Sequence, residues 1–203
     1  INIAAGSYSE EGITVPDGTS NVTFDGAGTA ATIFTGGGSS RFMHLTNSGD
    51  SDNSNNTSNI TISDMKITGY GSSDRGGAIK IEENVTPVTF TNVLFHNNSC
   101  SKSSSPDYEA GGAVFIEQGT TTTFTSCEFT SNSASNSQGG AIQCSGVSGT
   151  TNTITLNKCK FGGNSSSVYA GAIQFDYCSS ITMNNCLFYE NTSDKGGATG
   201  TWQ

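Results

Sequence analysis

The chain has 203 residues, of which 12% are charged and 33% hydrophobic, and its 8 basic and 17 acidic residues give a net charge of −9. This length is enough for one domain with a continuous core. Because the basic residues form no cluster and no run of 18 apolar residues occurs, neither a nucleic-acid interface nor a membrane-spanning helix is predicted. The sequence opens at Ile1 without Met or a signal peptide, and we expect it to be a fragment of a longer protein.

The first third of the chain, residues 1–75, carries the weaker part of a repeating pattern. Val22-Thr23-Phe24 has the same alternation of apolar and polar side chains as Val88-Thr89-Phe90, which predicts short strands joined by turns. Asn47–Ser58 is almost purely Ser, Asn, Asp and Gly and predicts a solvated loop. We expect two less regular coils here.

From residue 76 onward, two short motifs alternate. The first is a triplet of small residues followed by an aliphatic residue or Thr, at Gly76–Ile79, Gly111–Val114, Gly139–Ile142, Ala170–Ile173 and Gly196–Thr199. The second is Phe-x-x-Asn, at Phe95–Asn98, Phe129–Asn132, Phe161–Asn164 and Phe188–Asn191. Successive units start at residues 76, 111, 139, 170 and 196, so they are 26 to 35 residues apart. A period in this range indicates a solenoid, in which each unit buries its apolar face against the next.

Within each unit, apolar residues alternate with polar ones, with one slip, which predicts strands with one buried face. Five segments align without gaps: Asn59–Ile67, Pro87–Phe95, Thr121–Phe129, Thr153–Phe161 and Ser180–Phe188. Because no helical periodicity is evident, we predict an all-β fold, a parallel β-helix of about six coils that forms a single domain over residues 1–203. A second polar run, Ser99–Pro106, predicts another solvated loop.

Two residue types are predicted to be structural. Asn98, Asn132, Asn164 and Asn191 should form an inward asparagine ladder that satisfies backbone groups at a corner. The cysteines occupy columns that elsewhere hold Val, Met, Ile or Ala, so we expect free, buried thiols rather than disulfides. Cys178 has no assigned place. The absence of any CxxC pair argues against a zinc site.

The alternating motifs from Gly76 to Ala198 resemble those of the passenger domains of chlamydial polymorphic membrane proteins, a class of autotransporter adhesins. The resemblance implies a right-handed, single-stranded, pectate-lyase-like β-helix that is displayed on the cell surface, or on the outer membrane in a bacterium, and that works in attachment. Related β-helical surface proteins carry similar repeats. The membrane-anchoring barrel of that family has no counterpart in this sequence, and the family fixes no catalytic residues.

β-Helices also include polysaccharide lyases and hydrolases, which need clustered carboxylates. The best candidate ligand face is an outward column just after the glycine-rich motifs, with Glu82, Glu117, Ser145 and Asp176, and Lys80 lies two residues before Glu82. This column could bind a cation or a sugar, or it could be a solvated strand face on which Lys80 offsets the repulsion. We favour the solvated face and predict no enzyme, no cofactor and no metal.

Two further surface features suggest alternatives. One outward column is uniformly threonine, at Thr23, Thr61, Thr89, Thr123, Thr155 and Thr182. Such ranks resemble ice-binding surfaces, although Thr also suits exposed parallel strands. Among the Asn-x-Ser/Thr sequons, Asn55 and Asn56 in the polar loop are the expected glycosylation sites if the source is eukaryotic.

We therefore predict a non-catalytic extracellular or cell-surface β-helix that acts in adhesion or structural display. Loops Asn47–Ser58 and Ser99–Glu109 would bind a receptor or glycan on a host or neighbouring cell. The alternatives are a subunit of an extracellular filament that joins copies end to end, a polysaccharide-active enzyme and an ice-binding protein.

Overall fold

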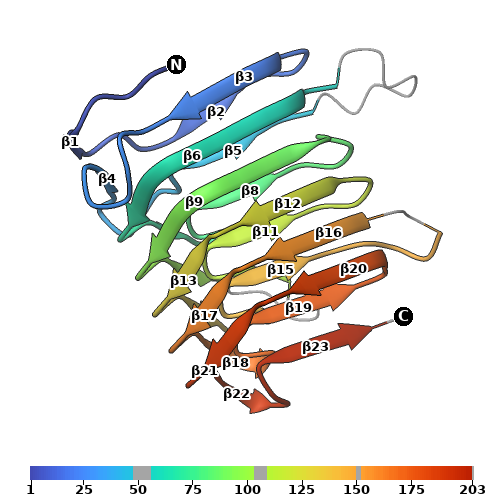
Figure 1. Ribbon diagram of the computed structural model, residues 1–203. Helices are drawn as coiled ribbons and strands as arrows, with labels where there is room; N and C mark the ends of the chain where they lie inside the picture. The colour runs from blue at the N-terminus through green and yellow to red at the C-terminus, as the bar shows by residue number, and fades with distance from the viewer. Residues whose placement is uncertain (48–55, 103–108, 150–151, 203) are drawn as a thin grey trace.

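The structure is a computed structural model that describes residues 1–47, 56–102, 109–149 and 152–202. Within these residues every regular element is a β-strand, and the 23 strands form three parallel sheets. The sheets wind into a solenoid of about five turns, close to the predicted six, with the N-terminus at one end of the stack and the C-terminus at the other (Figure 1). None of the described residues lies in a helix that is long and apolar enough to cross a membrane.

Sheet 1 is the largest and has 11 strands. Its strands are β1 (Gly6–Tyr8), β3 (Ser20–Asp25), β4 (Thr32–Thr35), β6 (Ser58–Thr68), β9 (Val88–His96), β12 (Thr121–Thr125), β13 (Glu128–Thr130), β16 (Asn152–Asn157), β17 (Lys160–Gly162), β20 (Cys178–Asn184) and β21 (Leu187–Tyr189).

The other two sheets complete each turn. Sheet 2 has the strands β2 (Ile13–Val15), β5 (Met43–Leu45), β8 (Ile79–Ile81), β11 (Val114–Ile116), β15 (Ile142–Cys144), β19 (Ile173–Asp176) and β23 (Thr199–Trp202). Sheet 3 has β7 (Gly71–Ser72), β10 (Ser99–Ser101), β14 (Ser133–Ser135), β18 (Ser165–Tyr169) and β22 (Thr192–Lys195).

The predicted inward columns are confirmed by the strand register. In sheet 1, Phe95, Phe129, Phe161 and Phe188 pair in turn, and the centroids of successive rings lie 4.8 Å apart. This distance equals the usual spacing between neighbouring strands, so each ring stacks directly on the next. In sheet 2 the aliphatic residue of each glycine-rich motif pairs with that of the next. One hydrophobic cluster runs from Val15 to Phe175.

The break in the alternation of buried and exposed side chains is caused by the backbone conformation of one residue. The residue at the slip adopts a positive φ in every unit, with angles of 51° to 56°, which reverses the direction of the next side chain. These residues are Asp64, Asn92, Ser126, Lys158 and Asn185. The long strands β6 and β9 run through this position, whereas later coils divide there into two strands.

The second residue of the first four glycine-rich motifs is fixed by the neighbouring coil. A Cβ atom on Gly112 would overlap the carbonyl oxygen of Gly140, and one on Gly140 would overlap that of Gly171. Any larger residue would therefore force the coils apart.

The N-terminal coils use the same sheets with more irregular pairing. Val22-Thr23-Phe24 aligns with Val88-Thr89-Phe90 through β6, as predicted. Both β3 and β4 pair with β6, and sheet 3 begins only at β7. This part of the chain is the less regular one that the sequence indicates.

The two predicted polar loops lie largely outside the described residues, which omit 48–55 and 103–108. At its start the second prediction is wrong, because Ser99–Ser101 forms β10. Cys100 replaces Ala134 in the inward column there and is fully buried, so this polar run still supplies a core side chain.

Candidate functional site

The four asparagines of the Phe-x-x-Asn motifs form a continuous hydrogen-bonded ladder inside the corner between sheets 1 and 3. Asn98 Nδ2 donates to Asn132 Oδ1 at 3.1 Å, and Asn132 Nδ2 donates to Asn164 Oδ1 at 2.9 Å. Asn164 Nδ2 then donates to Asn191 Oδ1 at 2.9 Å. Each amide nitrogen also donates to the carbonyl of the preceding coil's strand, such as Phe95 O for Asn132 at 3.1 Å.

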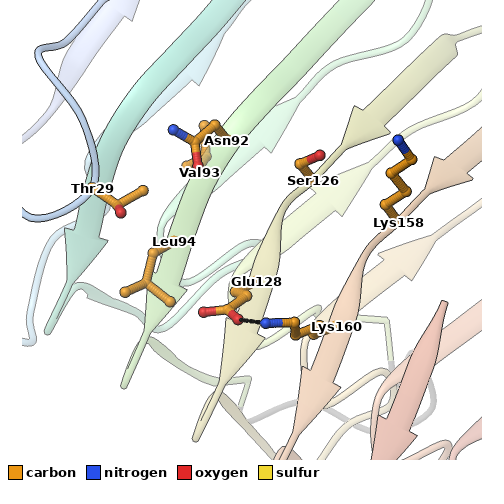
Figure 2. A pocket seen from close by; sticks show the side chains of 8 residues that line it. All are labelled: Thr29, Asn92, Val93, Leu94, Ser126, Glu128, Lys158 and Lys160. Carbon is orange, nitrogen blue, oxygen red and sulfur yellow. Dashed lines mark hydrogen bonds and ion pairs between the residues drawn. The ribbon is translucent and has the colours of Figure 1, made fainter. Parts of the chain in front are cut away.

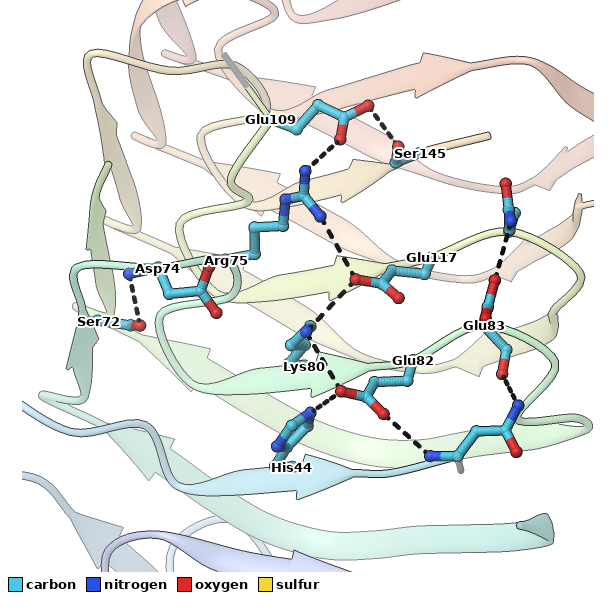
Figure 3. Close-up of polar contacts among 12 residues, drawn as sticks. His44, Ser72, Asp74, Arg75, Lys80, Glu82, Glu83, Glu109, Glu117 and Ser145 are labelled. Carbon is cyan, nitrogen blue, oxygen red and sulfur yellow. Dashed lines mark hydrogen bonds and ion pairs between the residues drawn. The ribbon is translucent and has the colours of Figure 1, made fainter. Parts of the chain in front are cut away.

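A cluster of charged side chains lies outside sheet 2, at the edge where its strands end (Figure 3). His44 and Lys80 are paired positions on β5 and β8, while Glu82 and Glu117 each follow directly after a strand. The parallel register stacks these positions in successive coils. Two of the three residues of the predicted ligand face, Glu82 and Glu117, are therefore neighbours.

Glu82 is held by three donors. Its Oε1 lies 2.8 Å from His44 Nε2 and 3.3 Å from Lys80 Nζ, and its Oε2 accepts from the backbone N–H of Asn47 at 3.0 Å. An ionised carboxylate can only accept, so His44 presents its protonated Nε2 to Glu82. Burial opposes the charged form of Glu82, but Asn47, His44 and Lys80 outweigh it, and the pKa of Glu82 lies below its ordinary value.

For His44, unlike Glu82, burial outweighs the effect of the partners. Burial lowers the pKa of His44, and this effect exceeds the stabilisation of the imidazolium by Glu82, while Lys80 and Arg41 lower the pKa further. At neutral pH the His44–Glu82 contact is therefore a hydrogen bond from a neutral imidazole to a carboxylate.

Lys80 connects this group to the next coil. Its Nζ lies 3.4 Å from Glu117 Oε1, which is also 3.5 Å from Arg75 Nη1. Arg75 Nη2 in turn lies 3.2 Å from Glu109 Oε2, and Glu109 accepts a short hydrogen bond from Ser145 Oγ. Lys80 thus stands between the two carboxylates and offsets their repulsion. Part of the cluster lines an open pocket of about 250 Å³, whose walls include Arg75, Glu109, Glu117 and Ser145 together with Glu83 and Gln118.

The third residue of the predicted ligand face, Asp176, is not part of this cluster. Its side chain is buried, and its two oxygens accept from Gln143 Nε2 and Gln174 Nε2, both at 2.7 Å. Burial raises the pKa of Asp176 in spite of these two hydrogen bonds. The three carboxylates share a column in sequence but do not form one face.

A second surface feature was not predicted. A groove of about 390 Å³ runs across sheet 1 at the positive-φ bend and is lined by Thr29, Asn92, Val93, Leu94, Ser126, Glu128, Lys158 and Lys160 (Figure 2). Lys160 Nζ lies 2.6 Å from Glu128 Oε1. The gapless alignment of the repeats could have indicated this groove, because it places Leu94, Glu128 and Lys160 in one outward column.

The remaining predicted positions are partly described. The threonine column is in register from Thr23 to Thr182, and its side chains face outward. Asn56 is half-buried, and Asn55 lies outside the described residues. In the described part of the chain, no three His, Cys, Asp or Glu side chains are grouped so that they could hold a metal ion.

The fold and its motifs define a parallel β-solenoid built from alternating glycine-rich and Phe-x-x-Asn units. A family model, the Chlamydia polymorphic membrane protein repeat, matches residues 126–145, which include Phe129–Asn132 and Gly139–Ile142. The chain is thus similar to the passenger domains of these proteins. No curated protein and no solved structure gives a significant match to the chain.

Proposed function

We propose that the chain is a surface-exposed β-solenoid whose role is adhesion or structural display, without catalysis. The match to the Chlamydia polymorphic membrane protein repeat supports an extracellular or outer-membrane location of the autotransporter-passenger type. The proposed partner is a receptor or glycan on another cell.

One observation supports this role most strongly: the inward phenylalanine column repeats, whereas the outward column next to it changes from coil to coil. The inward phenylalanine column is Phe95, Phe129, Phe161 and Phe188. The adjacent outward column is Lys66, Leu94, Glu128, Lys160 and Leu187. Stacking of the rings favours Phe in each coil of the inward column, but the outward column next to it carries no such requirement. A regular scaffold that presents a varied surface is suited to recognition.

Two surfaces offer the concave, mixed chemistry that binding requires. The groove at the bend combines the aliphatic Leu94 with the charged Glu128 and Lys160, and the pocket beside sheet 2 combines Glu117 with Arg75. Carboxylates and cations of this kind make directional hydrogen bonds with sugar hydroxyls and with polar protein groups.

The proposal is tested by attachment of beads coated with the chain to cultured epithelial cells. Two variants keep the core intact: Leu94→Ser with Lys160→Ser alters the groove, and Glu117→Gln with Gln118→Ala alters the sheet 2 pocket. We expect attachment well above that of albumin-coated beads, and at least a tenfold loss in one of the two variants. Attachment equal to albumin on all cell types, together with no binding to an array of immobilised glycans, would contradict adhesion.

The threonine register favours one alternative, ice binding, because Thr61, Thr89, Thr123 and Thr155 repeat at the strand spacing. The neighbouring outward column contains Ser63, Thr91, Thr125 and Asn157 and so is mixed. Thermal hysteresis of the purified chain, with Thr123→Tyr as the disabling variant, decides between ice binding and display.

A further inference from the structure

The two sulfur atoms of Cys144 and Cys178 lie in contact across neighbouring coils. Cys178 Sγ is 2.9 Å from Cys144 Sγ, although the two residues are 34 positions apart in sequence. A disulfide bond is about 2.05 Å long, so the two thiols need to approach by less than 1 Å to be joined. Both are free thiols in the structure.

A local irregularity of the backbone produces this contact. Phe175 is the residue that pairs with Cys144 in sheet 2. Regular strand pairing alone would therefore give Cys144 an aliphatic or aromatic neighbour and no second thiol. The corner that follows is the shortest of the repeats, because only Tyr177, with a φ of 52°, separates β19 from β20. In the preceding coil β15 ends at Cys144 and β16 begins at Asn152.

The same corner contains a register shift. Asn152 pairs with Cys178 but Thr153 pairs with Ser180, so β20 has one extra residue at this point. An extra residue in one strand changes the direction in which its side chains point. Here it directs Cys178 toward the core, where it packs against the hydrophobic cluster, rather than outward like Ser180.

The two thiols differ in their exposure to solvent, which gives them different roles. Cys144 is fully buried, and its sulfur accepts a hydrogen bond from Asn152 Nδ2 at 3.4 Å. Cys178 is half-buried and can be reached from solvent. In the stacked column of Cys127, Cys159 and Cys186 the thiols point at backbone carbonyls such as Phe90 O and Phe124 O, and neighbouring thiols of that column also interact with each other.

We propose that Cys144 and Cys178 are a site of disulfide formation that joins two successive coils of the solenoid. The oxidant is a small-molecule disulfide. The thiolate of Cys178 attacks one sulfur of that disulfide, forms a mixed disulfide and releases one thiolate. The thiolate of Cys144 then attacks Cys178 Sγ and releases the second thiolate, so two cysteine thiols and one disulfide give one internal disulfide and two small thiols.

The bond would close a loop of the chain from residue 144 to residue 178 and hold the C-terminal coils on the stack. Closing a loop of this size restricts the unfolded chain, and for a protein of this length we expect the oxidised form to melt about 10 °C above the reduced form. Reduction with dithiothreitol should remove the difference.

The test uses the purified chain equilibrated with oxidised glutathione at pH 8 and then denatured in an alkylating reagent. We expect mass spectrometry to show four alkylated cysteines of the six, and a cross-linked peptide pair that contains Cys144 and Cys178. Cys178→Ser should leave the remaining five thiols alkylated and abolish the difference in melting temperature. Cys159→Ser, in the separate column, should retain the cross-linked peptide pair and the difference in melting temperature.

Cys144 is in the core and its variants can fail to fold, so the half-buried Cys178 carries the test. Circular dichroism verifies that Cys178→Ser is folded. Six alkylated cysteines in the folded, glutathione-treated wild type would overturn the proposal. A disulfide between Cys127 and Cys159, or a dimer linked through Cys178, would overturn it equally.

Discussion

The inner corner and the outer edge of the same coils follow opposite rules. At the inner corner, Asn98, Asn132 and Asn164 make the same hydrogen bonds in each coil. At the outer edge of sheet 2, successive coils have Glu82, Glu117 and Ser145 at one position, and each finds different partners. A solenoid thus constrains the positions that contact their own copies in the next coil and leaves this outer edge free to vary.

Asn132→Ala should have the largest effect, because Asn132 bonds in both directions along the ladder. Its loss leaves the Phe95 carbonyl and the Asn98 amide without their partners in a dry corner. Each buried orphan costs about 1–3 kcal/mol, so we expect the two to cost about 2–6 kcal/mol, measured by urea unfolding. Asn191→Ala is the matched control at the more exposed end of the ladder and should cost less than half as much.

Phe129→Ala should follow, because its ring stacks between those of Phe95 and Phe161. Removing a buried aromatic ring costs about 3–5 kcal/mol when the surroundings cannot collapse. Leu94→Ala, one column outward, tests the contrast directly and should cost under about 1 kcal/mol. Equal effects of the two substitutions in urea unfolding would contradict the distinction between inner and outer columns.

Lys80→Met should cost less, about 1–2 kcal/mol, because it leaves Glu82 and Glu117 facing each other without the intervening cation. The partly exposed setting of the cluster limits the effect. Adding Glu117→Gln should restore most of the lost stability, and a double-mutant cycle measures the coupling between Lys80 and Glu117. If the two substitutions were additive, Lys80 would not act on the carboxylates.

The smallest predicted effects are two opposite responses to pH. His44 has a lowered pKa in the folded chain, so its contribution to stability is complete above about pH 6.5 and is lost as the pH falls through the folded pKa. Asp176 has a raised pKa, so its contribution is complete below about pH 3.9 and is lost as the pH rises through the folded pKa.

Substitutions separate the two responses in urea unfolding between pH 4 and pH 7. Asp176→Asn should gain stability relative to the wild type as the pH rises, and the buried Gln143 and Gln174 amide oxygens can accept from the new amide after a flip. His44→Gln should gain relative to the wild type as the pH falls. If the free energy of unfolding changed with pH in the same way for the wild type and both variants, neither group would have a different pKa in the folded and unfolded chain.

The sequence was sufficient to predict the inner columns because they depend only on strand register. The gapless alignment of the repeats fixes which phenylalanines, asparagines and aliphatic residues stack, and the structure has the same pairings. The sequence also indicated that Lys80 offsets the repulsion between the carboxylates, since it precedes Glu82 by two positions.

The features that the sequence did not reveal lie at or near the corners between sheets, whose lengths differ between coils. Asp176 shares a column with Glu117, yet it is covered by Gln174 of its own strand and by Gln143 of the preceding coil. Cys178 had no assignable place because the extra residue in β20 becomes evident only when the strands are paired. Arg75 reaches Glu109 from a connecting segment that no alternation pattern describes.

The glycine overlap between successive coils, described for Gly112 and Gly140, bears on how such a chain can change length in evolution. Each unit meets its neighbours through the same glycine, asparagine and phenylalanine positions, so duplication or deletion of a whole unit creates no new junction. A partial unit would place a side chain against a carbonyl where only glycine fits. Genes for such rods should therefore gain and lose sequence in whole units, each adding about 4.8 Å to the rod and moving every later surface site by the same step.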